Sequence, residues 1–238
     1  MGGMRTAGTK RKTPAHPDEF FIGKRLMVVT AHPDDEGIAA GTMYKNHRAG
    51  GTTFLVCATY GEKGKSHLDR PVSDAALKRI RKQELLRAAE ILKIDRVLFL
   101  GMPDAGVRGR RADLYRKLLP IVRRIKPDYI LSFGPDGMSG HWDHITVGGV
   151  SLRIARRENI PMLAFTISPE FRRALPPERF MARRKFGSYR PGAPQHRESD
   201  VKIAVNAAVK RRAWSSHRSQ FSGRPPRFHF PYEHFVRE

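Results

Sequence analysis

The chain has 238 residues, of which 39% are hydrophobic, and this is enough for one sizeable core. It contains no run of about 18 apolar residues and no apolar segment near Met1, so we expect a cytoplasmic protein without a membrane span. The net charge of +22 would attract polyanions or phosphorylated substrates. A solvated basic surface explains the same charge, and we do not expect nucleic acid as the partner.

Residues 1–20 are rich in Gly, Thr, Pro, Lys and Arg. They predict a flexible basic tail, because little apolar surface is available to offset the entropy lost on ordering. An anion-binding arm is the alternative. Residues 21–238 are predicted to form a single domain, in which Cys57 lies within an apolar run and is expected to be a buried thiol.

Apolar segments alternate with helical patterns from residue 26 onward. Strands connected by helices of this length pair in parallel through right-handed crossovers. The sequence therefore predicts a Rossmann-like three-layer α/β fold with a mostly parallel sheet and a ligand site at the carboxyl ends of the strands. The predicted strands cover residues 26–30, 52–59, 97–100, 129–133 and 162–167, and the predicted helices cover 37–49, 73–92, 112–126 and a stretch that begins near His144.

Two later segments are outside this alternation. Residues 169–197 contain five prolines and eight basic residues, and we expect an irregular flap over the site or a contact between copies in a homo-oligomer. Residues 201–220 predict a final helix that carries Trp214 and His217. A structural role is expected for His217, with the nearby Ser and Gln side chains bracing the site.

The first motif with chemical content is His32-Pro33-Asp34-Asp35, which directly follows the first predicted strand. One histidine and three carboxylates within residues 32–36 are costly for stability unless a cation or protons intervene. Taken alone, the cluster could also cap a helix. The crowding favours a metal site or an acid–base site.

A second motif, Gly140-His141-Trp142-Asp143-His144, lies at the start of a predicted helix. Two imidazoles and one carboxylate with an open position make a catalytic zinc site or a ferrous site. Both motifs follow strand ends, as do Glu62 and Asp104, so we expect all of them on one rim of the sheet.

These motifs resemble those of the LmbE/PIG-L family of metal-dependent N-deacetylases. Further similar pieces occur in the family's order: the Gly-Glu loop at residues 61–62, an Arg-x-x-Glu element at residues 81–84, and a His-x-Ser-Gln signature at residues 217–220. The resemblance extends from about residue 25 to residue 222. One departure is Trp142, where the family usually has proline, and a bulkier side chain there affects sugar specificity more than chemistry.

The resemblance implies a role for each matching residue. His32, Asp35 and His144 would be the metal ligands, for Zn²⁺ or alternatively Fe²⁺. Asp34 would be the general base, and His141 would be the imidazolium that stabilises the oxyanion. Substrate binding or bracing of the rim would fall to Glu62, Arg81 and Asp104.

The resemblance thus implies a zinc-dependent hydrolase that removes an N-acetyl group from an N-acetylglucosamine-type sugar or conjugate. One alternative is an amidase of the same fold that acts on a larger N-acyl or thiol conjugate. Another is a basic module without catalytic activity that binds polyanions. The arginines that follow Asp104, at positions 108, 110 and 111, are expected to form a solvated face, with contact to an anionic group of the substrate as the alternative.

Overall fold

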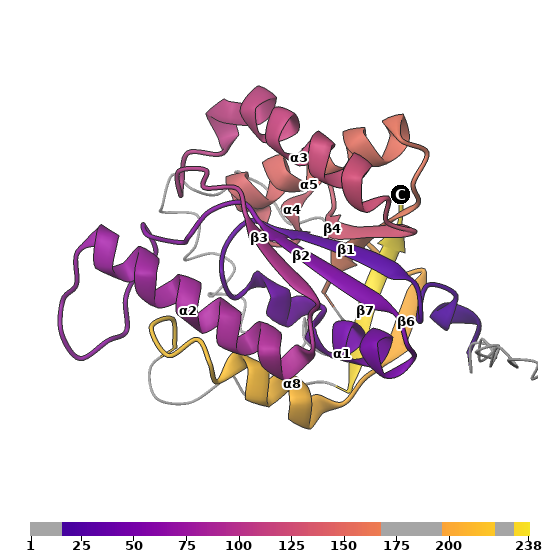
Figure 1. The fold of residues 1–238 in the computed structure, drawn as a ribbon, viewed down its shortest axis with the longest axis horizontal. Coiled ribbons are helices and arrows are strands. Elements are labelled where there is room, and N and C mark those ends of the chain that lie inside the picture. Colours follow the sequence, from indigo (N-terminus) through magenta and orange to yellow (C-terminus); the bar gives the residue numbers. More distant parts are fainter. Residues whose placement is uncertain (1–15, 168–196, 222–230) are drawn as a thin grey trace, which may run out of the picture.

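The structure is a computed structural model that describes residues 16–167, 197–221 and 231–238. In this part of the chain, a seven-stranded sheet lies between two layers of helices, with α3 and α5 over one face and α1, α2 and α8 over the other (Figure 1). The strands are β1 (Arg25–Thr30), β2 (Thr52–Cys57), β3 (Arg96–Phe99), β4 (Tyr129–Phe133), β5 (Met162–Thr166), β6 (Val201–Ala204) and β7 (Tyr232–Arg237). The helices are α1 (Ala40–Arg48), α2 (Asp74–Leu92), α3 (Arg111–Ile125), α4 (Gly137–Gly140), α5 (Trp142–Arg157) and α8 (Ala207–Trp214), with 3-10 turns η1 (Pro17–Glu19), η2 (Asp35–Ile38) and η3 (Arg108–Arg110).

The strand order is β3-β2-β1-β4-β5-β7-β6, and the first five of these strands are parallel. The chain builds outward from β1 to β3 and then returns to place β4 on the other side of β1. Such a reversal leaves a crevice at the carboxyl ends of the two central strands, where ligands bind in open α/β sheets. The predicted fold class is therefore confirmed, and the predicted site belongs to this crevice.

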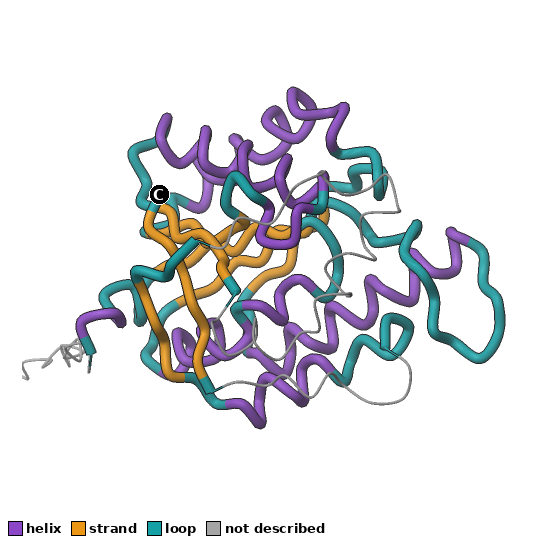
Figure 2. Tube along the Cα trace, turned by 180° about the vertical axis from the view of Figure 1, so that it is seen from behind, coloured by secondary structure: helices purple, strands orange, loops and turns teal. Residues whose placement is uncertain are grey.

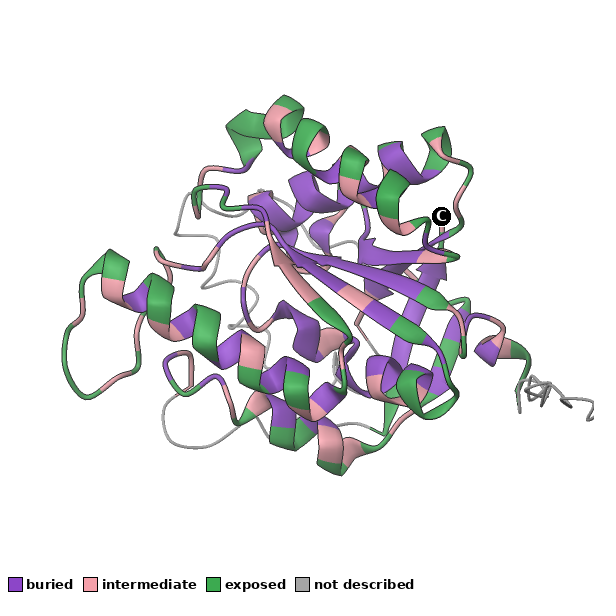
Figure 3. Cartoon of the chain, viewed as in Figure 1, coloured by how far each residue is buried: buried purple, intermediate pink, exposed green. Residues whose placement is uncertain are grey.

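Strand β1 runs through the centre of the core (Figure 3). Its residues from Leu26 to Val29 are fully buried, because helices cover both faces of the sheet. Cys57 at the end of β2 is also fully buried, as expected for a structural thiol. The core therefore holds the ends of β1 and β2 rigidly beneath the loops that follow them.

The predicted final helix over residues 201–220 is wrong at both ends, because α8 covers only Ala207–Trp214 and His217 lies in the turns that follow it. Residues 201–204 form β6, which pairs antiparallel with β7, and α8 begins only at Ala207 (Figure 2). In β6, Val201 and Ile203 are buried whereas Lys202 and Ala204 are exposed, which is the alternation of a strand with one covered face. The partner strand β7 was not predicted, so no strand was recognised with which residues 201–204 could pair.

The N-terminal segment that the structure describes begins at His16. Residues 17–19 form η1, and Asp18 accepts a hydrogen bond from the backbone N–H of Lys202 at 3.0 Å. Phe21 is fully buried in the core. Most of the predicted tail, residues 1–15, lies outside the described residues, and so does nearly all of the predicted flap, residues 169–196.

Among the residues that the structure describes, no helix combines the length and the apolar character needed to cross a membrane. Between β4 and α5 lies the short helix α4, whose Met138 has φ 58°. This irregular segment leads directly into α5 and brings the second histidine motif against the end of β1.

Candidate metal centre

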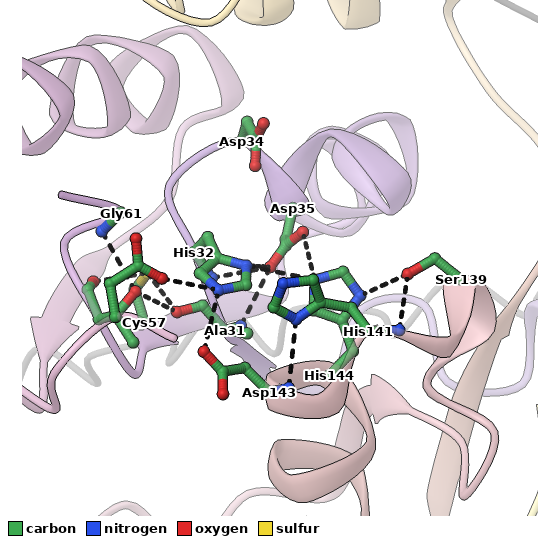
Figure 4. Close-up of polar contacts among 12 residues, drawn as sticks. Ala31, His32, Asp34, Asp35, Cys57, Gly61, Ser139, His141, Asp143 and His144 are labelled. Carbon is green, nitrogen blue, oxygen red and sulfur yellow. Dashed lines mark hydrogen bonds and ion pairs between the residues drawn. The ribbon is translucent and has the colours of Figure 1, made fainter. Parts of the chain in front are cut away.

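The two histidine motifs meet at the crevice between β1 and β4. His32 follows β1, and η2 then carries Asp35 beneath it, while His141 caps the N-terminus of α5 and His144 lies in its first turn. The three imidazole rings have centroids 4.9 to 5.2 Å apart (Figure 4). Segments more than 100 positions apart in the sequence therefore form one cluster.

The side chains of the three predicted metal ligands lie next to one another. His32 Nδ1 is 3.2 Å from His144 Nε2, and Asp35 Oδ1 is 3.3 Å from the same Nε2. The second carboxylate oxygen, Oδ2, lies 3.5 Å from His32 Nδ1 and accepts hydrogen bonds from the backbone N–H groups of Ala31 at 3.1 Å and His32 at 2.7 Å. These bonds fix the carboxylate so that Oδ1 faces the cluster.

The hydrogen bonds of His144 determine which of its nitrogens carries the proton. Nδ1 lies 3.3 Å from the carbonyl oxygen of Gly137, which can only accept, and 3.1 Å from Ser139 Oγ. The proton therefore sits on Nδ1, and Nε2 presents its lone pair to His32 and Asp35. Phe133 stacks on the His144 ring with centroids 4.0 Å apart and holds its orientation.

His32 is oriented in the same way by carboxylates. Its Nε2 lies 3.2 Å from Asp104 Oδ1 and 3.4 Å from Asp143 Oδ2, so Nε2–H donates to these acids. Asp143 Oδ2 also accepts the backbone N–H of Ala105 at 3.0 Å. In this tautomer His32 Nδ1 carries a lone pair that faces His144.

Lone pairs from two imidazoles and one carboxylate oxygen thus converge, and this arrangement calls for a cation. Donor atoms that bind zinc tetrahedrally at about 2.0–2.1 Å lie roughly 3.3 Å from one another, which matches the 3.2 and 3.3 Å separations around His144. A carboxylate or carbonyl partner on the outer nitrogen is also typical of metal-binding histidines. The residues present therefore fit a divalent metal.

Two further donor groups share His32. In each, three donor atoms lie within 4.8 Å of one another; one is His32 with His141 and His144, and the other is His32 with Asp104 and Asp143. The second group lies on the Nε2 side of the His32 ring, where the two acids act as hydrogen-bond acceptors. Without a cation, burial lowers the pKa of His32, but Asp104, Asp143 and Asp35 outweigh burial and raise it well above its usual value.

Asp34 lies apart from the ring cluster, and its carboxylate makes no hydrogen bond or ion pair with the described residues (Figure 4). Burial, together with the negative charge of Asp35, raises the pKa of Asp34 to about 7. A carboxylate that can accept a proton near neutral pH suits a general base.

His141 caps α5 and lies beside the other two imidazole rings. Its Nδ1 accepts the backbone N–H of Asp143 at 3.2 Å, which places the proton of the neutral ring on Nε2. Burial, with the neighbouring His144 and His32, lowers the pKa of His141 to about 4. These surroundings favour the neutral ring in the metal-free protein, and the imidazolium role that the family resemblance implies stays a prediction.

The three residues expected to bind substrate differ in their contacts. Arg81 donates to the carbonyl oxygens of Gly61 at 2.5 Å and Lys65 at 3.1 Å, and so braces the loop after β2. Asp104 accepts the Lys63 N–H at 2.7 Å in addition to its contact with His32. Glu62 Oε1 accepts the Asp104 N–H at 3.2 Å, but its Oε2 is buried without a partner in the described part of the chain. Glu62 therefore has one carboxylate oxygen that no described residue engages.

Two contacts of the site were not foreseen from the sequence. One is Asp143, which lies inside the second motif and holds His32. The other is the pair of Glu36 Oε1 and His217 Nε2, which lie 2.5 Å apart across 181 positions. The run of acids in the first motif was a signal for Glu36, but nothing in the sequence connects it to His217.

The departure at Trp142 lies at the rim of the site. The guanidinium of Arg108 stacks over the Trp142 ring at 3.6 Å from its centre. Arg110 and Arg111 are exposed, in agreement with the expected solvated face. The indole thus anchors η3 against the start of α5.

The fold and the site together define an α/β protein with a candidate metal centre at the topological switch point of its sheet. The chain belongs to the PIG-L family, described as GlcNAc-PI de-N-acetylase, and the match covers residues 27–155. The resemblance drawn from the motifs is therefore confirmed.

Three individual proteins show how far the similarity extends. A 1D-myo-inositol 2-acetamido-2-deoxy-alpha-D-glucopyranoside deacetylase of Streptomyces avermitilis is 36% identical over 156 residues, which are 56% of this chain and 53% of that protein. The chain thus spans about half the length of this relative. The N,N'-diacetylchitobiose deacetylase of Pyrococcus horikoshii superposes with a TM-score of 0.64 at 21% identity, over 90% of this chain and 84% of that chain.

GalB, the 4-carboxy-2-hydroxymuconate hydratase of Pseudomonas putida, superposes with a TM-score of 0.59 at 23% identity, over 83% of this chain and 80% of that chain. A deacetylase and a hydratase thus share this fold. At such identities the superpositions show the fold alone, and the reaction has to be argued from the site.

Proposed function

We propose that this protein is a zinc-dependent hydrolase that removes the N-acetyl group from an N-acetylglucosamine-type sugar or a conjugate of one. The observation that carries the proposal is that His144 Nε2 lies 3.2 Å from His32 Nδ1 and 3.3 Å from Asp35 Oδ1. Three protein ligands with an open position are typical of a catalytic zinc site. Fe²⁺ is the alternative metal, because two histidines and one carboxylate also suit ferrous iron.

When bound, zinc would lower the pKa of a water molecule and polarise the amide carbonyl. Asp34 would take the proton from the attacking water at its carboxylate, which is not engaged by the described residues. After the attack the same carboxylic acid can deliver the proton to the departing amine. The products are acetate and the free amino sugar.

His141 would act on the oxygen of the amide carbonyl. Because its Nδ1 accepts the Asp143 N–H, the proton of its neutral ring is on Nε2, and from a ring centred 4.9 Å from that of His32 this N–H would donate to the carbonyl oxygen. A fixed donor of this kind contributes most once negative charge develops on the carbonyl oxygen. Tyrosine, lysine or arginine is not required for this step in the proposed scheme.

Substrate recognition is proposed for the loops that surround the centre. Glu62 Oε2 would bind a sugar hydroxyl, while Arg81 and Asp104 keep the loop after β2 and the loop after β3 in register. The names of the Streptomyces and Pyrococcus proteins favour an acetamido sugar as the reacting part. A homo-oligomer and a cytoplasmic location stay predictions from the sequence.

The test is a screen of N-acetylglucosamine, its disaccharide and inositol conjugates for released primary amine, with Zn²⁺ or Fe²⁺ added to the chelator-treated protein. We expect amine release that depends on added metal and is lost in His144→Ala. Release from larger N-acyl conjugates alone would favour the amidase alternative. Salt-sensitive retention on heparin, without amine from any substrate, would favour the polyanion-binding alternative.

A further inference from the structure

Asp34 has a backbone conformation that needs support. It precedes η2 with φ 114° and ψ −25°, in a region that residues with a Cβ rarely adopt. Such strain persists only where the surrounding structure holds it, and it is concentrated at functional sites. The question is therefore which contacts hold Asp34 in place.

Glu36 supplies the direct contact. Its Oε2 accepts the backbone N–H of Asp34 at 2.9 Å, and its side chain is fully buried. The other oxygen, Oε1, lies 2.5 Å from His217 Nε2. On the far side of that ring, Gln220 Nε2 lies 3.2 Å from Nδ1. A line of polar contacts thus runs from the C-terminal turn to the backbone of Asp34.

The C-terminal turn is itself fixed to the body of the fold. Ser219 donates through its backbone N–H and its hydroxyl to Glu84 of α2, at 2.7 and 2.6 Å. All of these side chains except Gln220 are at most 1% exposed. The backbone at Gly37 also packs directly against Trp214 at the end of α8, since a Cβ on Gly37 would lie 1.7 Å from Trp214 Nε1. The turn after Asp34 is therefore clamped between α2 and α8.

We propose that Glu36 and His217 are positioning residues that hold Asp34 in its left-handed conformation and so aim its carboxylate at the reacting centre. This inference rests on the proposed function only for the statement that Asp34 is the base. Neither residue touches the substrate in this account. Their effect reaches the reaction through the backbone of Asp34.

A second buried carboxylate offers a matched control. Glu233 of β7 accepts the backbone N–H groups of Gly41 and Thr42 at 2.9 and 2.8 Å, and it pairs with Lys210 of α8 at 2.7 Å. It is 3% exposed. Glu233 therefore has the same kind of partners as Glu36, a backbone N–H and a cation-forming side chain, but it supports α1 instead of Asp34.

The experiment compares Glu36→Ala, Glu36→Gln and Glu233→Ala in the metal-loaded protein. Displacing a reacting group by about 1 Å costs roughly 100-fold in rate, so Glu36→Ala is expected to lower kcat by about 100-fold with KM and metal content unchanged. Glu36→Gln is expected to recover most of the loss, because an amide oxygen can still accept the Asp34 N–H. Glu233→Ala is expected to lower Tm and to leave kcat unchanged.

A wild-type kcat in Glu36→Ala would overturn the proposal, and so would an equal loss in Glu233→Ala, which would indicate general loosening. If Glu36→Ala does not fold, His217→Leu replaces it, with the same expected loss in kcat and retained metal. A readout without turnover is the φ angle of Asp34 in a crystal structure of the variant. Departure from the left-handed region supports positioning, and an unchanged φ contradicts it, even if the wild-type protein releases no amine and the proposed function fails.

Discussion

His32 Nδ1 and His144 Nε2 lie 3.2 Å apart although 112 positions separate the two residues. The other nitrogen of each ring faces hydrogen-bond acceptors. His32 Nε2 faces the carboxylates of Asp104 and Asp143, and His144 Nδ1 faces the carbonyl oxygen of Gly137. Neither of the two facing nitrogens then holds a proton in the neutral rings. This relationship is the physical basis for placing a divalent metal here.

Replacing His144 by alanine should strip the metal, because it removes the Nε2 atom that lies next to the two other proposed ligand atoms, His32 Nδ1 and Asp35 Oδ1. We expect metal content per chain to fall from one to near zero after dialysis, measured by atomic emission. His47→Ala, at an exposed position on α1, is the matched control and should keep its metal. Full occupancy in His144→Ala would refute that ligand.

Asp34→Asn should retain the metal and lose most turnover. The amide cannot take a proton from water, and general base catalysis contributes about 100- to 10,000-fold. Steady-state amine release and metal content are measured on the same preparation. If metal and turnover disappear together, Asp34 and Asp35 have exchanged roles.

Asp104→Asn should weaken metal binding without abolishing it. The Asp104 carboxylate accepts from His32 Nε2 at 3.2 Å, and loss of such an outer partner lowers metal affinity by about 10- to 100-fold. Competition with a chromophoric chelator gives the dissociation constant. Asp113→Asn on α3 serves as the control, because the Asp113 carboxylate forms an ion pair with the exposed side chain of Arg116. Equal affinities in wild type and Asp104→Asn would show that the acid does not support His32.

Stability of the metal-free protein should depend on pH through His217. Burial by itself lowers the pKa of His217, but the charge and hydrogen bond of Glu36, with Asp34 and Glu84, outweigh it and raise the pKa above its usual value. The folded state therefore binds the proton more tightly than the unfolded state. This contribution is fully present below pH about 6.5, the pKa of the unfolded chain, and is lost as the pH rises through the folded pKa.

The measurement is the Tm of metal-free wild type and His217→Gln as a function of pH. We expect the difference between them to be larger at pH 6 and smaller at alkaline pH. A difference that grows as the pH rises would mean that the folded state favours the neutral ring.

Much of the fold followed from local patterns. Continuous apolar runs such as residues 26–30 predicted buried parallel strands, and the position of His32 and His141 just after strand ends predicted that they would meet. Residues 201–204 were misread because their alternation needs β7 as a partner, and β7 is almost 30 positions further along the chain. Pairing between distant segments is not visible in local periodicity.

The site, like the fold, could be predicted from the sequence only in part. Residue types and family resemblance selected the ligand set, whereas the proton positions came from contacts that only the structure shows. Asp143 was inside a recognised motif, yet its contact with His32 Nε2 depends on the turn into α5. Glu36 and His217 are connected through a fold that places the C-terminal turn beneath η2, and no spacing rule predicts that contact.

The most direct test of the account is anomalous diffraction at the zinc absorption edge from crystals of the zinc-loaded protein. We predict one strong peak per chain within bonding distance of His32 Nδ1, His144 Nε2 and Asp35 Oδ1, with Asp34 outside the coordination sphere. A peak on the other side of the ring, between His32 Nε2, Asp104 and Asp143, or no peak among these residues, would contradict it.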